Sequence, residues 1–308
     1  MKNILFFWVI AVNIIGCNKN IVDTRFCSTE ITNCKLNIKK YDLSETKEFN
    51  QDEGICFAKS LNNDDIVISL YDGTFDCDFY ILNLKNDEKC SFVCREYGGL
   101  FYVVNNNIIF QDRAGLVCTF DPYIQKVVKQ DKPKKLFQPH EDGNDKRLRK
   151  YQFGSYGNSV LINRFEKDLS FDYKSDAVKL PYSFRLLSTT NGKTNNDFYM
   201  LVEKSEEVLL INYDFKRNKI LREILVTSLQ NDMDYRISSS PDTHCIMIFY
   251  KNETRLDILF YNIERNVMYY LADGLEKYSR FQDWDFNSKY VLFTSDIERT
   301  VYKIEVPN

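Results

Sequence analysis

The sequence predicts an all-β fold built from a unit of about 45 residues that recurs along the chain. The support comes from the composition, from two segments near the C-terminus that align with each other, and from weaker copies upstream. Phe, Tyr and Trp make up 15% of the 308 residues, whereas Ala occurs five times. Because Ala is the best helix former and large aromatic residues suit pleated, half-buried surfaces, this composition favours sheets over helices.

The clearest copies of the unit are residues 239–250 and 284–295, which are offset by 45 positions. Each begins with a polar turn and continues into an apolar strand. A charged turn and a second apolar strand follow in both, at 256–262 and 300–306. Such turn–strand–turn–strand units at a fixed period are typical of the blades of a β-propeller.

The same turn-to-strand pattern recurs four times upstream. The first apolar residues of the six strands follow one another at an average spacing of 45 residues: Ile66, Ile108, Val160, Phe198, Ile246 and Val291. We therefore predict a β-propeller with six four-stranded blades, and the spacing leaves room for a seventh. A β-sandwich is the alternative all-β architecture, but a sandwich domain rarely needs so long a regular stretch.

Closure of the ring is predicted from the last unit, which contains only about three strands between residues 281 and 306. An incomplete blade would leave an exposed strand edge. We expect the segment 32–43 to supply the fourth strand, so that an N-terminal strand closes the last blade. No linker rich in Pro, Gly or Ser divides residues 27–308, which we interpret as a single propeller domain.

The N-terminus has the pattern of a signal peptide. Lys2 precedes residues 4–15, which are apolar except for Asn13, and Gly16 and Cys17 follow. Twelve helical residues span about 18 Å, well short of the roughly 30 Å hydrocarbon core of a membrane. We expect residues 1–16 to be a signal peptide rather than a transmembrane helix.

Residues 14–17, Ile-Ile-Gly-Cys, resemble the lipobox of bacterial lipoproteins. This resemblance implies that Cys17 carries the lipid, as acyl chains such as palmitate, and that residues 17–26 form a lipidated tether. Several acyl chains on one Cys anchor a protein stably without spanning the membrane. Two alternatives are an ordinary secretory signal with a coincidental Cys, and an uncleaved N-terminal anchor.

The blade turns carry a second resemblance. The segments 240–242, Ser-Pro-Asp, and 284–287, Trp-Asp-Phe-Asn, look like the blade turns of TolB-type propellers. Together with the lipobox, the chain resembles six-bladed propeller lipoproteins of bacteria, which implies a binding platform. Thr243 and Ser288 stand where that family normally has Gly, so these turns must adopt their backbone angles by other means.

The charge of the chain gives no reason to expect nucleic acid as a partner, because 41 basic residues face 44 acidic ones. The exception is the stretch 126–150, with nine basic and four acidic residues. It coincides with the longest gap between units, so we interpret it as an insertion between blades. It is either a solvated loop or a site for anionic headgroups or an acidic glycan.

Few residues suit catalysis or metal binding. His140 and His244 are the only histidines, which excludes a three-His zinc site, and we expect both to be solvated. The carboxylates of residues 71–78 are better explained by a hairpin turn than by calcium. No nucleophile-elbow, zincin or phosphate-loop motif is present. We therefore predict no catalytic residue, metal or cofactor.

Eight cysteines follow Cys17. Seven of them precede residue 119, namely Cys27, Cys34, Cys56, Cys77, Cys90, Cys94 and Cys118, and the eighth is Cys245. In an exported protein an even number suggests disulfides, and the connectivity does not follow from the sequence. Buried thiols are the alternative, and a zinc cluster lacks the usual paired spacing.

The first functional hypothesis is a lipid-anchored, extracytoplasmic β-propeller in the bacterial cell envelope. It would bind a protein or glycan partner on one face of the disc as a monomer, without catalysis. A second is a polysaccharide lyase or glycosidase with carboxylates in the central funnel. A third is a eukaryotic secretory-pathway propeller.

Overall fold

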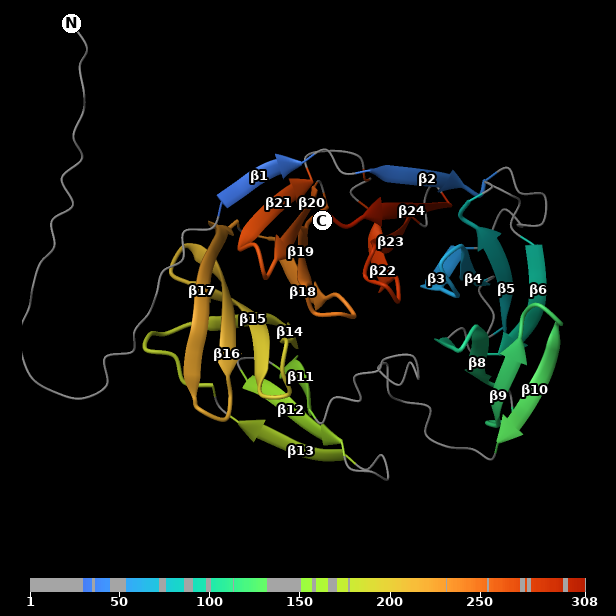
Figure 1. Ribbon diagram of the computed structural model, residues 1–308, viewed down its shortest axis with the longest axis horizontal. Helices are drawn as coiled ribbons and strands as arrows, with labels where there is room; N and C mark the ends of the chain where they lie inside the picture. Colours follow the sequence, from blue (N-terminus) through green and yellow to red (C-terminus); the bar gives the residue numbers. More distant parts are fainter. Residues whose placement is uncertain are drawn as a thin grey trace, which may run out of the picture.

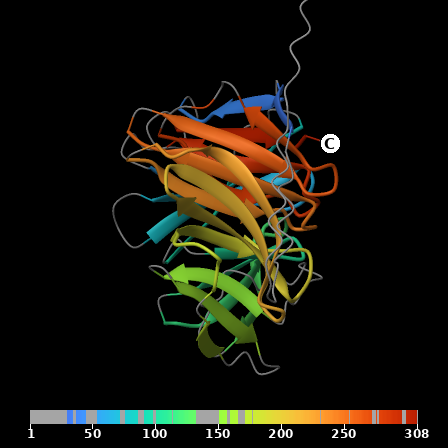
Figure 2. The same cartoon turned by 90° about the vertical axis from the view of Figure 1, so that its left-hand side faces the viewer.

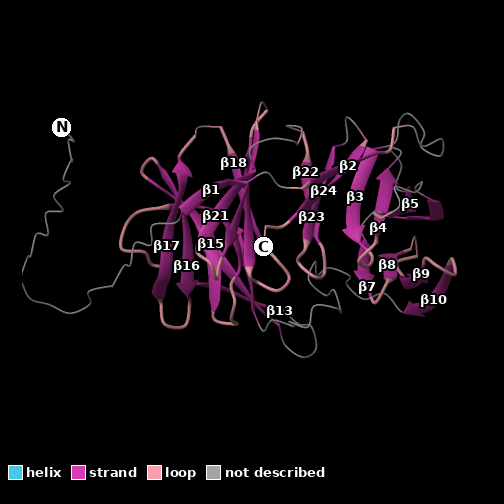
Figure 3. Ribbon diagram, turned by 45° about the horizontal axis from the view of Figure 1, so that its top comes forward, coloured by secondary structure: helices cyan, strands magenta, loops and turns pink. Residues whose placement is uncertain are grey.

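The computed structural model describes residues 30–34, 37–44, 54–71, 76–85, 91–97, 101–112, 114–131, 151–156, 159–165, 171–176, 178–230, 232–253, 255–271, 275, 278–295 and 299–307. All regular elements of this part of the chain are β-strands (Figure 3). They form six sheets arranged in a ring around a centre (Figure 1). No helix long and apolar enough to cross a membrane occurs within these residues.

Blades 1 to 3 follow one another along the chain. Blade 1 contains β3 (Gly54–Ser60), β4 (Asp65–Tyr71), β5 (Asp76–Asn83) and β6 (Ser91–Tyr97). Blade 2 contains β7 (Phe101–Val104), β8 (Asn107–Gln111), β9 (Val117–Asp121) and β10 (Lys126–Asp131). Blade 3 contains β11 (Tyr151–Tyr156), β12 (Ser159–Phe165) and β13 (Phe171–Asp176).

Blades 4 to 6 complete the ring, and two of them take a strand from the N-terminal segment. Blade 4 contains β14 (Arg185–Asn191), β15 (Asp197–Lys204), β16 (Glu207–Asp214) and β17 (Lys219–Ser228). Blade 5 contains β18 (Asp234–Ser239), β19 (Cys245–Lys251), β20 (Leu256–Asn262), β21 (Val267–Leu271) and β1 (Glu30–Cys34). Blade 6 contains β22 (Arg280–Trp284), β23 (Tyr290–Ser295), β24 (Thr300–Glu305) and β2 (Ile38–Asp42).

The all-β prediction and the six-bladed repeat are confirmed. Among the described residues four of the sheets have the predicted four strands, whereas the sheet of blade 3 has three and that of blade 5 has five. Each of the six residues used to find the repeat lies in the second strand of a successive sheet: Ile66, Ile108, Val160, Phe198, Ile246 and Val291. All six are almost completely buried. The spacing was visible in the sequence because each of these second strands contains a short run of apolar residues directly after a polar turn. The described residues form no seventh sheet.

The N-terminal segment closes the ring as predicted, but it serves two blades rather than one. β2 pairs antiparallel with β24 and completes blade 6. The earlier residues 32–34, which we expected in that same strand, lie in β1, and β1 pairs parallel with β21 of blade 5. Both blades end in a strand edge at the rim of the disc, and one continuous segment covers both edges.

The core lies between the blades. Five clusters of buried apolar residues each join two neighbouring sheets, from blade 3 to blade 4 and onward through blades 5, 6, 1 and 2. At the ring closure, Tyr41 of β2 and Ile55 of β3 belong to the same cluster as Tyr290 of β23. Each large apolar side chain buried in this way stabilises the folded state by about 1.5 to 3 kcal/mol. Figure 2, turned by a right angle, shows how these sheets fan out as stacked layers.

The first strand of each sheet lies toward the centre of the ring. Neighbouring first strands contact one another, as β11 does with β14, β14 with β18, and β3 with both β22 and β7. Between blades 5 and 6, Trp284 Nε1 on β22 donates to Ser238 Oγ on β18 at 2.8 Å. Because strands within a blade alternate in direction, the first-to-second and third-to-fourth turns emerge on one side of the disc, which we call the turn face.

Candidate interaction surface on the second blade

The turns between the first and second strands of blades 5 and 6 show how Thr243 and Ser288 stand at positions where glycine was expected. Thr243 and Ser288 both have a φ of 60°. Their backbone N–H groups donate to Ser240 O and Asp285 O, each at 2.9 Å. These turns therefore use the left-handed conformation that Gly normally supplies, at a position where a side chain costs energy.

The third-to-fourth turns form a second repeat that the sequence analysis missed. The side-chain oxygens of Asp121, Asp214 and Asn262 each accept hydrogen bonds from the backbone N–H groups two and three residues later. Four residues after each of them stands a non-Gly residue with a positive φ: Gln125, Asn218 and Asn266. The signal was present in the sequence as Asp or Asn followed four positions later by Asn or Gln.

Hydrogen bonds connect neighbouring blades across the turn face. Blade 5 contacts blade 4 through Ser239 N, which donates to Thr190 Oγ1 at 2.9 Å. Blade 5 contacts blade 6 through Asp242 N, which donates to Ser288 Oγ at 3.0 Å. Blade 6 contacts blade 1 through Asn287 Nδ2, which donates to Asn63 Oδ1. These bonds link the inner strands or turns of successive blades, so they hold the blades in a fixed relative position.

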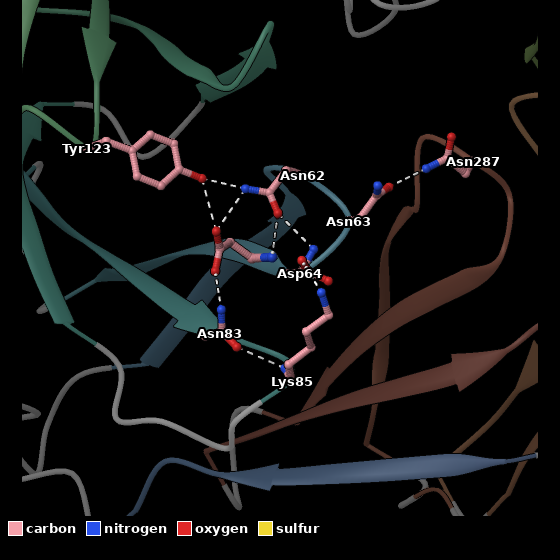
Figure 4. Close-up of polar contacts among 8 residues, drawn as sticks. Asn62, Asn63, Asp64, Asn83, Lys85, Tyr123 and Asn287 are labelled. Atoms are coloured by element: carbon pink, nitrogen blue, oxygen red, sulfur yellow. Dashed lines mark hydrogen bonds and ion pairs between the residues drawn. The ribbon is translucent and has the colours of Figure 1, made fainter.

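The network is densest where blade 1 meets blade 2 (Figure 4). Asn62 Oδ1 accepts from the backbone N–H groups of Asp64 at 2.7 Å and Asp65 at 2.8 Å. The Asn62 Nδ2 group donates to Asp65 Oδ2 at 2.8 Å and to Tyr123 Oη. Tyr123 Oη in turn donates to Asp65 Oδ2 at 3.0 Å. Partial burial, together with the hydrogen bond to Asp65, raises the pKa of Tyr123 to about 12.

Two further contacts surround this core of the cluster. Asn83 Nδ2 donates to Asp65 Oδ1 at 2.8 Å, and Lys85 Nζ lies 2.5 Å from Asp64 Oδ2. Both carboxylates therefore have their partners inside the fold. Asn62 and Asp65 therefore hold the Tyr123 hydroxyl in place, and with it the backbone that follows Tyr123 (Figure 4). We call this hydrogen-bonded group the ordered polar base; it consists of Asn62, Asp64, Asp65, Asn83 and Lys85.

The turn and strand that follow this base expose a run of apolar side chains. Tyr123, Ile124, Val127 and Val128 are 54%, 56%, 47% and 52% exposed, and they are half of the exposed large hydrophobic residues in the described part of the chain. We call these four residues the apolar hairpin. Lys126 and Lys129 flank it and are also exposed. Contiguous exposed apolar side chains with a polar surround are characteristic of interaction sites.

Comparison within the repeat shows that the turn geometry does not require these apolar residues. Tyr123 and Ile124 occupy the positions that Lys216 and Arg217 hold in blade 4. In blade 5, Glu264 and Arg265 hold them. All three turns have the same cap and the same positive φ, with values of 52°, 51° and 56°. The apolar character of the blade 2 turn is therefore a separate property of this blade and points to contact with another molecule.

The remaining candidates from the sequence are distributed as follows. His244 lies half exposed in its turn, as expected, with Nδ1 2.9 Å from Glu264 Oε1. Cys17 and His140 lie outside the described residues, as does most of the basic stretch 126–150, of which only 126–131 is described. Cys56, Cys77, Cys118 and Cys245 are thiols rather than disulfides. No three His, Cys, Asp or Glu side chains of the described residues come together as a metal site.

Carboxylates are sparse at the centre of the ring. The six first strands contain two, Asp234 near the start of β18 and Asp283 near the end of β22. Two of the buried acids, Glu223 and Asp257, lie farther out and have partners of their own. Glu223 on β17 accepts from Tyr182 Oη at 2.7 Å, and Asp257 Oδ2 on β20 lies 2.5 Å from Arg255 Nε. Among the described strands, the arrangement therefore differs from the paired central carboxylates expected of a glycosidase.

Comparisons with known proteins support the fold. No protein-family model matches the chain, and no curated protein matches it. Among solved structures, an oligogalacturonate lyase in complex with manganese has a TM-score of 0.51 at 11% identity, covering 91% of this chain and 99% of that one. The WD40 domain of Neurospora crassa Pan2 has a TM-score of 0.46 at 9% identity, covering 91% and 98%. The likeness to the lyase structure concerns architecture, and together with the six sheets it shows that the protein is a β-propeller.

Proposed function

We propose that this chain is a binding module: a lipid-anchored, extracytoplasmic β-propeller, related to TolB-type lipoproteins, that holds a protein or glycan partner. The observation that carries the proposal is the apolar hairpin on its ordered polar base. Binding surfaces combine apolar contact residues with preorganised polar groups, and a rigid surface loses little conformational entropy when it binds. The proposed anchor at Cys17 rests on the lipobox resemblance.

The proposed contact site is tested by photo-crosslinking in the native host. A photo-reactive amino acid replaces Ile124 in one protein and Arg217, its counterpart in blade 4, in the other. We expect a discrete adduct from position 124 that is lost when Val128→Asp is added, and none from position 217. Protease digestion of the adduct distinguishes a protein partner from a glycan. Equal labelling at both positions, or none at 124 in intact envelopes, would contradict the proposal.

A polysaccharide lyase is the second candidate because the oligogalacturonate lyase described above shares the propeller architecture, although fold alone does not carry activity from one protein to another. Incubation with polygalacturonate, followed by ultraviolet detection of the new carbon–carbon double bond, separates the two functions. The binding proposal predicts no double bond formation. Turnover by the wild-type chain that survives Ile124→Arg would place the function elsewhere in the molecule.

A further inference from the structure

The outer edge of blade 4 is exposed and carries apolar side chains. β17 is the longest of the described strands and the outermost in its sheet. Two of its residues, Leu221 and Leu225, are 47% and 50% exposed. A long edge strand with exposed leucines is a surface that proteins normally cover or blunt. β17 has two register shifts against β16, at Leu221 and at Val226, and β10, the edge of blade 2, has one between Val127 and Lys129.

The rims of the next two blades are already covered by the N-terminal segment of this chain. β1 lies on the rim of blade 5 and β2 on the rim of blade 6, and their first residues are eight positions apart. From β1 to β2 the segment follows the ring in the order of the blades, from blade 5 to blade 6. Figure 1 shows the beginning of β1 beside the end of β17, and Figure 3 agrees.

The same step of eight residues identifies the segment that would lie on blade 4. Counting back from Glu30 gives residues 22–26, Val-Asp-Thr-Arg-Phe, with residues 27–29 as a connection of the same length as 35–37. Three extended residues span about 10 Å, which suffices for both connections. Val, Thr and Phe alternate with the two charged residues, which is the pattern of a strand with one apolar face.

We propose that residues 22–26 add a strand to the outer edge of β17, so that one N-terminal belt covers the rims of blades 4, 5 and 6. The strand runs parallel to β17, as β1 runs parallel to β21. Val22 and Phe26 lie on the side that meets Leu221 and Leu225. The belt continues an interface that the fold already contains and does not depend on the proposed binding function.

Hydrogen exchange followed by mass spectrometry tests the belt in the chain lacking only residues 1–17. We expect protection of residues 22–26 and of the outward amides of β17. The double variant Val22→Asp/Phe26→Asp should speed exchange at β17 at least tenfold. The matched control Arg25→Ser lies on the other side of the strand and should leave exchange unchanged.

Two results would overturn the belt. One is wild-type exchange of residues 22–26 at the rate of an unstructured peptide, a measurement that needs no variant. The other is protection of β17 that disappears on dilution together with a change from dimer to monomer by light scattering, because a second copy would then cover the edge. Leu225→Asp provides the reciprocal check, since it should deprotect residues 22–26.

Discussion

Thr243 and Ser288 occupy a backbone conformation that suits glycine, and both are needed for turns between inner strands. A left-handed non-Gly residue costs roughly 1 to 2 kcal/mol. Thr243→Gly removes this cost, and it loses the packing of a buried side chain and a hydrogen bond from Thr243 Oγ1 to Asp242 O within the same turn. We expect the variant to raise the free energy of unfolding by about 1 kcal/mol in chemical denaturation.

Ser288→Gly is the matched comparison for this prediction. It relieves the same strain but also removes the Oγ atom that accepts from Asp242 N in the next blade. The gain in stability should therefore be smaller than for Thr243→Gly. A loss of stability in Thr243→Gly would show that its turn is held by side-chain packing rather than limited by backbone strain.

Tyr123 gives a prediction for alkaline pH. Its pKa in the folded protein is about 12, above the ordinary value of 10, so the folded state keeps a proton that the unfolded state loses first. The contribution of Tyr123 to stability is complete below pH 10 and is lost as the pH rises toward 12. Tyr123→Phe should therefore lessen the fall in the free energy of unfolding between pH 10 and 12, measured by urea denaturation. An unchanged fall would contradict the network in Figure 4.

At the scale of elements, β2 is the strand that joins the two ends of the ring. Tyr41 is buried, and its Oη donates to Leu84 O of blade 1 at 2.8 Å. Tyr41→Phe removes this hydrogen bond and should lower the free energy of unfolding by about 1 kcal/mol. Tyr41→Ala also leaves the space of the aromatic side chain empty and should lower the free energy of unfolding by about 3 to 5 kcal/mol.

Lys40→Ala, an exposed neighbour on β2, is the control for the Tyr41 variants and should change stability by less than about 0.5 kcal/mol. Equal and small effects of Tyr41→Ala and Lys40→Ala in thermal and chemical denaturation would mean that β2 is not part of the cooperative fold. In that case the ring would be closed by the contacts of β22 and β23 with β3.

The elements that could be predicted from the sequence are the strands whose own burial requires a local run of apolar residues. Ile246 and Val291 identified second strands because each lies in a run of at least four consecutive apolar residues. The pairing of β1 with β21 joins residues more than 200 positions apart, and nothing local specifies it. The apolar hairpin was missed because exposure depends on neighbours: Val127 and Val128 read as an ordinary buried strand until the edge position of β10 is known.

At the scale of the whole molecule, the proposed belt and the apolar hairpin lie on opposite sides of the ring. β17 and β1 stand at one side of Figure 1 and β10 at the other. If residues 22–26 cover β17, only residues 18–21 remain between Cys17 and the disc, a reach of about 14 Å. An anchor at Cys17 would then hold blade 4 near the bilayer and leave the apolar hairpin of blade 2 facing away from it.

This arrangement predicts separable effects of the anchor and the hairpin. Cys17→Ala should move the protein from the membrane to the soluble fraction without lowering its melting temperature, because Cys17 precedes all the residues that form the described sheets. Ile124→Arg, which copies the residue of blades 4 and 5, should leave both membrane retention and stability unchanged and abolish partner binding. Fractionation, melting curves and crosslinking measure these three properties independently.

Mass spectrometry of the mature N-terminus, taken from membranes of the native source, tests the central claim of a lipid-anchored binding module most directly. We predict a chain that begins at Cys17 and carries acyl groups. An intact Met1, or an unmodified N-terminus at another residue, would contradict the anchor and with it the proposed orientation of the disc.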